Sequence, residues 1–231
     1  ATLMMMRPMQ NPASPGKRNL WDDLVAGISY IRRHRAILSL IGMGVVTGVF
    51  GASFGTLLPV VAGQILEGEV DSYGFLLLSL GVGGLMGTLS IAVFVNLGNS
   101  LPLQLMTGIG FGLSLAIFSQ ISWLPASVVA ISLVGGFRAV FGTVNNTLVQ
   151  SLVTDEFRGR VMSIHMLAWG ASAGGGLLLG SIAEWVSAPI ALTIGGLVTA
   201  IGVGTLSMPA ARGIHGRSHI GPERSDHTRL G

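Results

Sequence analysis

The feature that most constrains this chain is a series of six apolar segments, each close to or above the length of a membrane crossing. A membrane-spanning helix needs about 20 predominantly apolar residues. The segments cover residues 36–65, 73–95, 101–121, 124–152, 161–186 and 189–208. Only 10% of the 231 residues are charged, against about 25% in a soluble domain. The sequence therefore predicts an all-α membrane protein with six transmembrane helices.

The basic residues assign a side of the membrane to each connection. Twelve of the thirteen lysines and arginines lie in three polar segments, at the start, between the fourth and fifth spans, and at the end: Arg7, Lys17, Arg18, Arg32, Arg33, Arg35, Arg158, Arg160, Arg212, Arg217, Arg224 and Arg229. Cytoplasmic connections carry an excess of Lys and Arg. We therefore expect both termini, residues 96–100 and residues 154–160 to lie in the cytoplasm, which an even number of spans permits.

The order of the spans predicts an internal symmetry. The first three spans start inside and the last three start outside, which is the arrangement of two inverted three-helix repeats. Glycines four residues apart let helix backbones approach closely, and ordinary glycine content of membrane helices is the alternative. Six such pairs occur: Gly44/Gly48, Gly51/Gly55, Gly83/Gly87, Gly108/Gly112, Gly170/Gly174 and Gly176/Gly180.

Segments outside the spans complete the predicted organisation. Residues 1–19 form a linker, residues 36–210 the six-helix bundle, and residues 211–231, which are polar and rich in Gly, Ser and Arg, a disordered cytoplasmic tail. Residues 20–35 are expected to form an amphipathic helix on the cytoplasmic surface, or else a simple extension of the first span. Apolar residues recur there at helical spacing: Leu20, Leu24, Ile28 and Ile31.

Several function classes are excluded by composition and motif content. The net charge is +3, but the basic residues flank apolar runs and do not line a polar face, so we expect no nucleic-acid partner. They are expected to meet anionic membrane lipid. The chain has no cysteine, and we find no nucleophile–base motif, metal-ligand motif or phosphate loop. The sequence therefore predicts neither an enzyme nor a metal site.

The thirteenth basic residue, Arg138, is the first candidate for a function. It lies near the middle of the fourth span, where an arginine costs about 2.5–3.5 kcal/mol. Asn145 is seven residues on and is expected to share its face, with Asn146 and Gln150 nearer the cytoplasm. We predict a polar stripe that lines a cavity, in which Arg138 meets an anionic substrate group or a coupling carboxylate. The alternatives are a structural arginine and asparagines that join helices.

Other ionisable residues give weaker signals. No Asp or Glu lies in the middle of a span, and Glu184 near the outer end of the fifth is interpreted as structural. His165, one turn into that span, can titrate, but we expect it to be solvated. Residues 154–160 contain four charges that are expected to form ion pairs between helix ends, or only to set topology: Asp155, Glu156, Arg158 and Arg160.

The sequence also resembles a known family. The runs N-T-L-V-Q at 146–150 and D-E-F-R-G-R-V at 155–161, together with the amphipathic entry at 20–35, resemble the major facilitator superfamily, in the branch of bacterial drug and enterobactin exporters. The resemblance covers about residues 20–208 and only the second six-helix half of a twelve-helix fold. Residues 1–6 look like the end of a sixth helix. The family's charged loop between the eighth and ninth helices is replaced here by N-L-G-N-S at 96–100, so no ionic latch is expected there.

This resemblance implies a function. Members of the superfamily work by alternating access coupled to an ion gradient, with the proton as the expected ion and no other cofactor. The chain would then be the carboxy-terminal half of a bacterial inner-membrane exporter of an amphipathic, drug-like or siderophore-like molecule, with a missing amino-terminal half as its partner. By resemblance Arg138, Asn145 and Asn146 would face the cavity, and Asp155, Arg158 and Arg160 would form a cytoplasmic gating loop. A half-size homodimeric transporter and a non-transporting accessory subunit remain alternatives.

Overall fold

The computed structural model describes residues 20–65, 70–94, 100–170 and 172–218, and these residues are helical apart from short connections. The linker at 1–19, most of the 96–100 loop and the tail beyond 218 lie outside the described residues. The helices, with η marking π-helical segments, are α1 (Leu20–Arg33), α2 (Arg35–Val46), η2 (Thr47–Gly51), α3 (Phe54–Val60), η3 (Val61–Ile65), α4 (Val70–Phe94), α5 (Ser100–Phe118), α6 (Leu124–Leu152), α7 (Asp155–Gly170), α8 (Ser172–Trp185) and α9 (Ala188–Ser218).

The prediction of six membrane-spanning helices is confirmed. The described chain contains six helical stretches that are long and apolar enough to cross a membrane: Arg35–Gly63, Ser72–Ile91, Ser100–Phe118, Leu124–Leu152, Asp155–Trp185 and Ala188–Ala211. The first is built from α2, η2, α3 and η3, and the fifth from α7 and α8. The all-α membrane fold class predicted from hydropathy is therefore correct.

Two helix boundaries differ most from the sequence prediction. The fifth span begins at Asp155, not at residue 161, because Asp155 and Glu156 stand in the first turn of α7, where carboxylates favour a helix N-terminus. The last helix continues to Ser218, beyond the predicted end of the bundle at 210.

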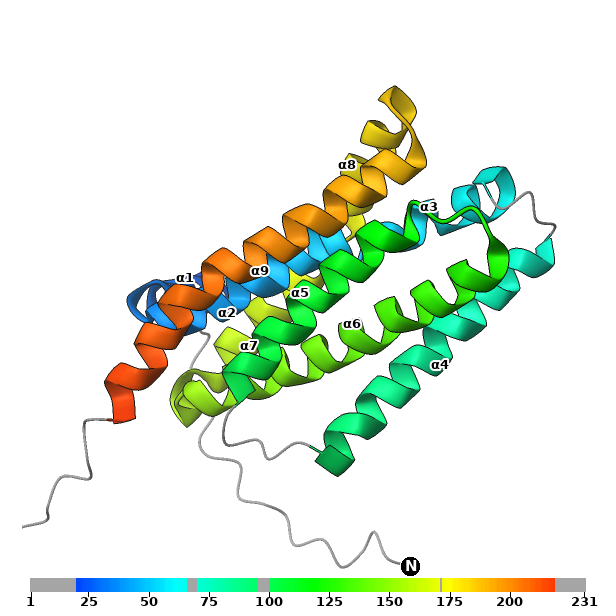
Figure 1. Cartoon of the computed structure of the whole chain (residues 1–231). Coiled ribbons are helices and arrows are strands. Elements are labelled where there is room, and N and C mark those ends of the chain that lie inside the picture. Colours follow the sequence, from blue (N-terminus) through cyan, green and yellow to red (C-terminus); the bar gives the residue numbers. More distant parts are fainter. Residues whose placement is uncertain (1–19, 66–69, 95–99, 171, 219–231) are drawn as a thin grey trace, which may run out of the picture.

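The helices pack along one another in a single bundle, as Figure 1 shows. α6 packs against both α4 and α5, α5 packs against α9, and α9 packs against α2. One end of the bundle holds α1, the end of α6, the beginning of α7 and the end of α9, and the opposite end holds the beginning of α4 and the end of α8 (Figure 1). Successive spans therefore run in alternating directions.

Close backbone contacts at glycine join several pairs of spans, among them the second with the fourth and the third with the sixth. A Cβ atom added to Gly87 of α4 would lie 2.6 Å from the carbonyl oxygen of Gly136 in α6, and one added to Gly196 of α9 would lie 2.5 Å from the carbonyl oxygen of Gly112 in α5. The close approach predicted for the pairs that contain Gly87 and Gly112 is thus present. Gly170 and Gly174 have nothing within 4 Å, as ordinary glycine content would give.

The first span is irregular, which the hydropathy pattern did not predict. Its α-helical course is interrupted by the π-helical segments η2 and η3, and Pro59 lies inside α3. The Ser53 hydroxyl lies 3.2 Å from the carbonyl oxygen of Gly48 and 2.9 Å from that of Ser172 in α8. This hydroxyl therefore ties the distorted part of the first span to the fifth span. π-Helical turns often occur at functional sites.

The helix predicted before the first span is present and separate from it. α1 ends at Arg33, two residues before the predicted end, because His34 has an extended backbone (φ −109°, ψ 92°) at the start of α2. α1 packs against α7 with Ile31 buried, while Trp21 is 77% exposed. An apolar side chain on the outer face of α1 fits the predicted position at a membrane surface.

Candidate functional site

Arg138, halfway along α6, lies at a pocket. The pocket, here called the polar pocket, has a volume of about 400 Å³ and is formed by α4, α6 and α7. Its lining residues are Thr88, Arg138, Ala139, Gly142, Thr143, Asn146, His165, Met166 and Trp169. Two of the four cavity residues predicted from the sequence, Arg138 and Asn146, are therefore neighbours in one pocket.

The wall formed by α6 follows the helical repeat. Arg138, Gly142 and Asn146 are four residues apart and so lie along one stripe of the helix. Arg138 is exposed and, within the described residues, has no ion pair or hydrogen bond. The hydroxyls of Thr88 and Thr143, by contrast, donate to carbonyl oxygens of their own helices, each at 2.9 Å. The guanidinium is thus the charged donor that this pocket presents.

Asn145 does not line the polar pocket. It is fully buried, and its Nδ2 donates to the carbonyl oxygen of Leu40 in α2 at 3.1 Å. The seven-residue spacing does put Asn145 on nearly the same face of α6 as Arg138. At the level of Asn145, however, α2 packs against this face, whereas at the level of Arg138 the face is exposed. The structure therefore places this asparagine between two helices, which is the arrangement of an interhelical hydrogen bond.

The other two amide side chains of α6 have different surroundings. Asn146 is partly buried, and its Oδ1 is inaccessible and without a hydrogen-bond partner among the described residues. Gln150 is exposed, lies one turn further toward the end of α6 and does not line the polar pocket. The stripe predicted from the sequence therefore enters the pocket only as far as Asn146.

Three residues of α7, His165, Met166 and Trp169, line this pocket although the sequence did not single them out as lining residues. His165 was expected to be solvated, and that expectation is wrong, because it is only 1% exposed. The Nε1 of Trp169 donates to its Nε2 at 3.3 Å, and the two rings are T-shaped. Residues four apart on a helix are neighbours, so the H-x-x-x-W spacing was the available signal.

The residues predicted to form a gating loop lie in the first turns of α7. Arg158 pairs with Asp155 at 2.8 Å within the helix, and both are exposed. Arg160 reaches the neighbouring helix and pairs with Asp23 of α1 at 2.8 Å. Glu156 is exposed. Of the two ion pairs that these residues form within the described part of the chain, Arg160–Asp23 joins two helices. The gating role of the four residues stays a prediction.

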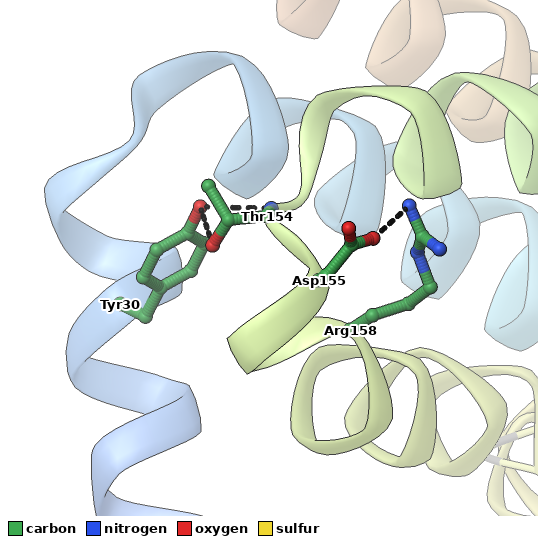
Figure 2. A network of polar contacts seen from close by, with 4 residues as sticks. All are labelled: Tyr30, Thr154, Asp155 and Arg158. Carbon is green, nitrogen blue, oxygen red and sulfur yellow. Dashed lines mark hydrogen bonds and ion pairs between the residues drawn. The ribbon is translucent and has the colours of Figure 1, made fainter.

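An aromatic contact accompanies that ion pair. Figure 2 shows Tyr30 of α1 beside Thr154, whose backbone N–H lies 3.4 Å from the Tyr30 hydroxyl. The Tyr30 ring is stacked on Phe157, with centroids 4.5 Å apart. The Asp155–Arg158 pair lies close by (Figure 2). α1 is therefore held against the start of the fifth span by stacking, hydrogen bonding and one ion pair.

A second hollow lies on the other side of α6. This hollow, here called the apolar groove, has a volume of about 530 Å³ and is formed by α4, α5 and α6. Among its lining residues are Met86, Met106, Leu133 and Phe137. The serine and threonine hydroxyls in it donate to carbonyl oxygens of their own helices, as Ser90 does to Met86 at 2.7 Å. The groove therefore presents hydrocarbon.

Comparisons with known proteins assign the chain to a family. Residues 1–214 match the model of the family described as transmembrane secretion effector. The chain is 26% identical over 159 residues to a staphyloferrin A transporter of Staphylococcus aureus, which covers 68% of this chain and 39% of that protein. It is 25% identical over 186 residues to the multidrug efflux pump Tap of Mycolicibacterium fortuitum, which covers 76% of this chain and 44% of that protein.

These comparisons have a clear extent. The chain spans less than half the length of the curated relatives that it matches. No solved structure matches it. The family and both relatives are transporters and not enzymes, and the six apolar helices belong to a multi-pass membrane protein. The resemblance inferred from the residues is confirmed, and the chain belongs to the transmembrane secretion effector family of the major facilitator superfamily of transporters.

Proposed function

We propose that this chain forms one wall of the substrate pathway in a secondary active transporter that works by alternating access. The observation that carries the proposal is Arg138, an exposed cation in the middle of a span that lines the polar pocket. Charged side chains at membrane depth face a bundle interior or a water-filled cavity and mark substrate or ion pathways. An arginine without a partner among the described residues is therefore best explained by a ligand or by water.

The substrate class follows from what surrounds the guanidinium. Arg138 offers a fork of donors that suits a carboxylate, while Trp169 and Met166 in the same pocket offer adaptable apolar surface. An amphipathic small molecule with an anionic group fits this combination, either drug-like or siderophore-like. The names of the two relatives, a staphyloferrin A transporter and a multidrug efflux pump, support such substrates, and the name of the second supports export.

The setting is proposed from the family and the charge pattern. Both relatives come from bacteria, and we place this chain in the bacterial inner (plasma) membrane. The basic segments that flank the spans, with Arg32 and Arg33 among their residues, belong on the cytoplasmic side by the positive-inside rule. An ion gradient, with the proton as the coupling ion, would drive transport.

A second six-helix unit is proposed to complete the pathway. Two spans are only slightly buried within this chain. The share of the most apolar part of the span that is buried is 11% for Ser72–Ile91 and 18% for Asp155–Trp185, whereas it is 61% for Arg35–Gly63. α4 and α7 also form the polar pocket, so the exposed side of the bundle includes the site. The second unit is either an amino-terminal half of the same protein or a second copy.

A carboxy-terminal tag followed by blotting of native membranes decides between them: a product of about twice the mass of this chain means one polypeptide, and a product of 23.9 kDa means pairing of separate chains.

The test of the site is replacement of Arg138 in the intact transporter. A hydrogen bond to a charged group contributes about 1.5–3 kcal/mol, so Arg138→Ala should weaken substrate binding by about tenfold to a hundredfold and abolish net efflux from loaded cells. Arg138→Lys should retain part of the activity, because it keeps the charge and loses the fork. Leu133→Ala, which removes an exposed apolar side chain on the opposite side of α6, is the matched control.

Two results would overturn the assignment. Normal efflux by Arg138→Ala, at normal membrane abundance, would remove Arg138 from the substrate pathway. Loss of a co-purifying partner with unchanged efflux would instead identify an accessory subunit in which Arg138 binds a partner helix.

A further inference from the structure

We propose that His165 is a proton-binding site whose occupancy controls the position of Trp169 in the polar pocket. The imidazole lies inside the bundle, only 1% exposed, on the side of α7 that faces α2 and α6. Histidine is the side chain that changes charge between about pH 5 and pH 8. The proposal goes beyond the proposed transport function and is tested without measuring transport.

The hydrogen bond to Trp169 fixes the proton on the neutral imidazole. An indole N–H can only donate, and the Trp169 Nε1 lies 3.3 Å from the His165 Nε2. Nε2 must therefore be the acceptor, and the single proton of the neutral ring is on Nδ1. When a second proton binds, Nε2 becomes a donor that faces another donor. The Trp169–His165 hydrogen bond cannot survive that change.

The space around the imidazole holds a second buried polar atom without a partner among the described residues. The Nδ1 of His165 and the Oδ1 of Asn145 are both buried and both lack a hydrogen-bond partner among the described residues. A Cβ atom added to Gly44 of α2 would lie 3.6 Å from the Trp169 Nε1, 3.7 Å from the Asn145 Oδ1 and 3.7 Å from the His165 Cε1. Two helices, α6 and α7, therefore direct an amide oxygen, an imidazole and an indole N–H toward Gly44 of α2.

Few other ionisable groups surround His165. From α6, Arg138 lines the same pocket. From α2 and η2, residues 36–51 contain no charged side chain. The remaining groups on α7 and its neighbours lie near helix ends: Asp22, Asp23, Tyr30, Arg32, Arg33, His34, Arg35, Asp155, Glu156, Arg158, Arg160 and Glu184. Arg138 is therefore the charge that most opposes protonation of His165, and an anionic ligand on Arg138 would favour it.

Release of Trp169 would change the pocket directly. A Cβ atom added to Gly142 would lie 3.2 Å from the Cη2 of Trp169, so the indole covers α6 between Arg138 and Asn146. Movement of the indole away from this position would uncover the backbone at Gly142 beside the guanidinium. Proton binding at His165 would thereby enlarge the part of the pocket that an anionic group must enter.

The experiment follows Trp169 fluorescence in the intact protein, reconstituted in liposomes, from pH 8 to pH 5. The Trp169 contribution is the emission that is lost in the variant Trp169→Phe. We expect this contribution to shift to longer wavelength and to become more sensitive to acrylamide quenching as the pH falls. His165→Gln should abolish the pH response, since its amide oxygen can still accept from the indole but does not titrate. His34→Gln, at the α1–α2 corner, should keep it.

Each outcome decides the proposal. A pH-independent Trp169 signal in the unaltered protein overturns it, and so does a response that persists in His165→Gln. If His165→Gln fails to accumulate in the membrane, His165→Asn takes its place. Retention of the pH response in His34→Gln still excludes His34 as the titrating group. Failure of this test leaves the role of Arg138 intact, and loss of transport in Arg138→Ala leaves this proposal intact.

Discussion

The two sides of α6 carry two hollows of similar size and opposite character. Consecutive residues, Phe137 and Arg138, line the apolar groove and the polar pocket respectively. α4 contributes to both as well, with Met86 in the groove and Thr88 in the pocket. Both hollows contain hydroxyl groups. The difference is therefore not the presence of polar atoms.

The difference lies in which polar atoms have partners. In the groove, the hydroxyls of Ser90, Thr107 and Ser132 donate to carbonyl oxygens of their own helices, each at 2.7 Å. In the pocket, Arg138 has no partner among the described residues, and neither has the inaccessible Oδ1 of the lining residue Asn146. Satisfied hydroxyls can face lipid, but an unpaired guanidinium at the same depth requires water or a ligand. The presence of polar groups alone therefore does not separate a lipid-facing surface from a candidate site. What separates them is whether those groups have hydrogen-bond or ion-pair partners within the protein.

Blocking each hollow with one large side chain tests this comparison most strongly. Ala139→Trp would fill the polar pocket from α6, and Leu133→Trp would fill the apolar groove from the same helix. We expect Ala139→Trp to reduce efflux to background and Leu133→Trp to leave efflux unchanged. Efflux should be measured at matched membrane abundance. Equal loss of efflux in both variants would show that the two hollows do not differ in function.

The contact between α4 and α6, which separates the hollows, gives the next prediction. A Cβ atom on Gly87 would clash with the Gly136 backbone at 2.6 Å, whereas one on Gly81 of the same helix meets nothing within 4 Å. Overpacking costs about 1–3 kcal/mol, so Gly87→Ala should lower the free energy of unfolding by that amount. Gly81→Ala should be neutral or slightly stabilising. Thermal unfolding of the detergent-solubilised protein measures both, and equal stability of the two variants would contradict the observed contact.

The sequence predicted the spans well because the hydropathy of a span is set by its own residues and not by its neighbours. The six spans, the separate α1 helix and the close approach at Gly83/Gly87 follow from composition, periodicity and spacing. Arg138 and Asn146 were also expected in one polar stripe, and both line the polar pocket. These features can be read within a single segment.

The features that sequence reasoning missed depend on neighbours. Whether Asn145 faces a cavity or another helix depends on the level at which α2 crosses α6, and periodicity within α6 carries no information on that crossing. The burial of His165 depends in the same way on α2 and α6. The π-helical turn at Thr47–Gly51 has no hydropathy signature. It lies where a Cβ atom added to Gly48 would be 3.3 Å from the carbonyl oxygen of Ala168 in α7.

The smallest predicted effect separates two adjacent asparagines. Asn145 donates to Leu40 and is fully buried, whereas Asn146 lines the polar pocket with an unpartnered oxygen. Interhelical hydrogen bonds in membranes contribute about 0.6 kcal/mol on average and at most about 1.7 kcal/mol, so Asn145→Ala should lower unfolding stability by an amount in that range. Asn146→Ala should leave stability unchanged and weaken substrate binding. Unfolding curves and binding titrations on both variants measure the two effects separately. If Asn145→Ala weakened substrate binding and Asn146→Ala lowered stability, the face of α6 open to substrate would be the one that carries Asn145.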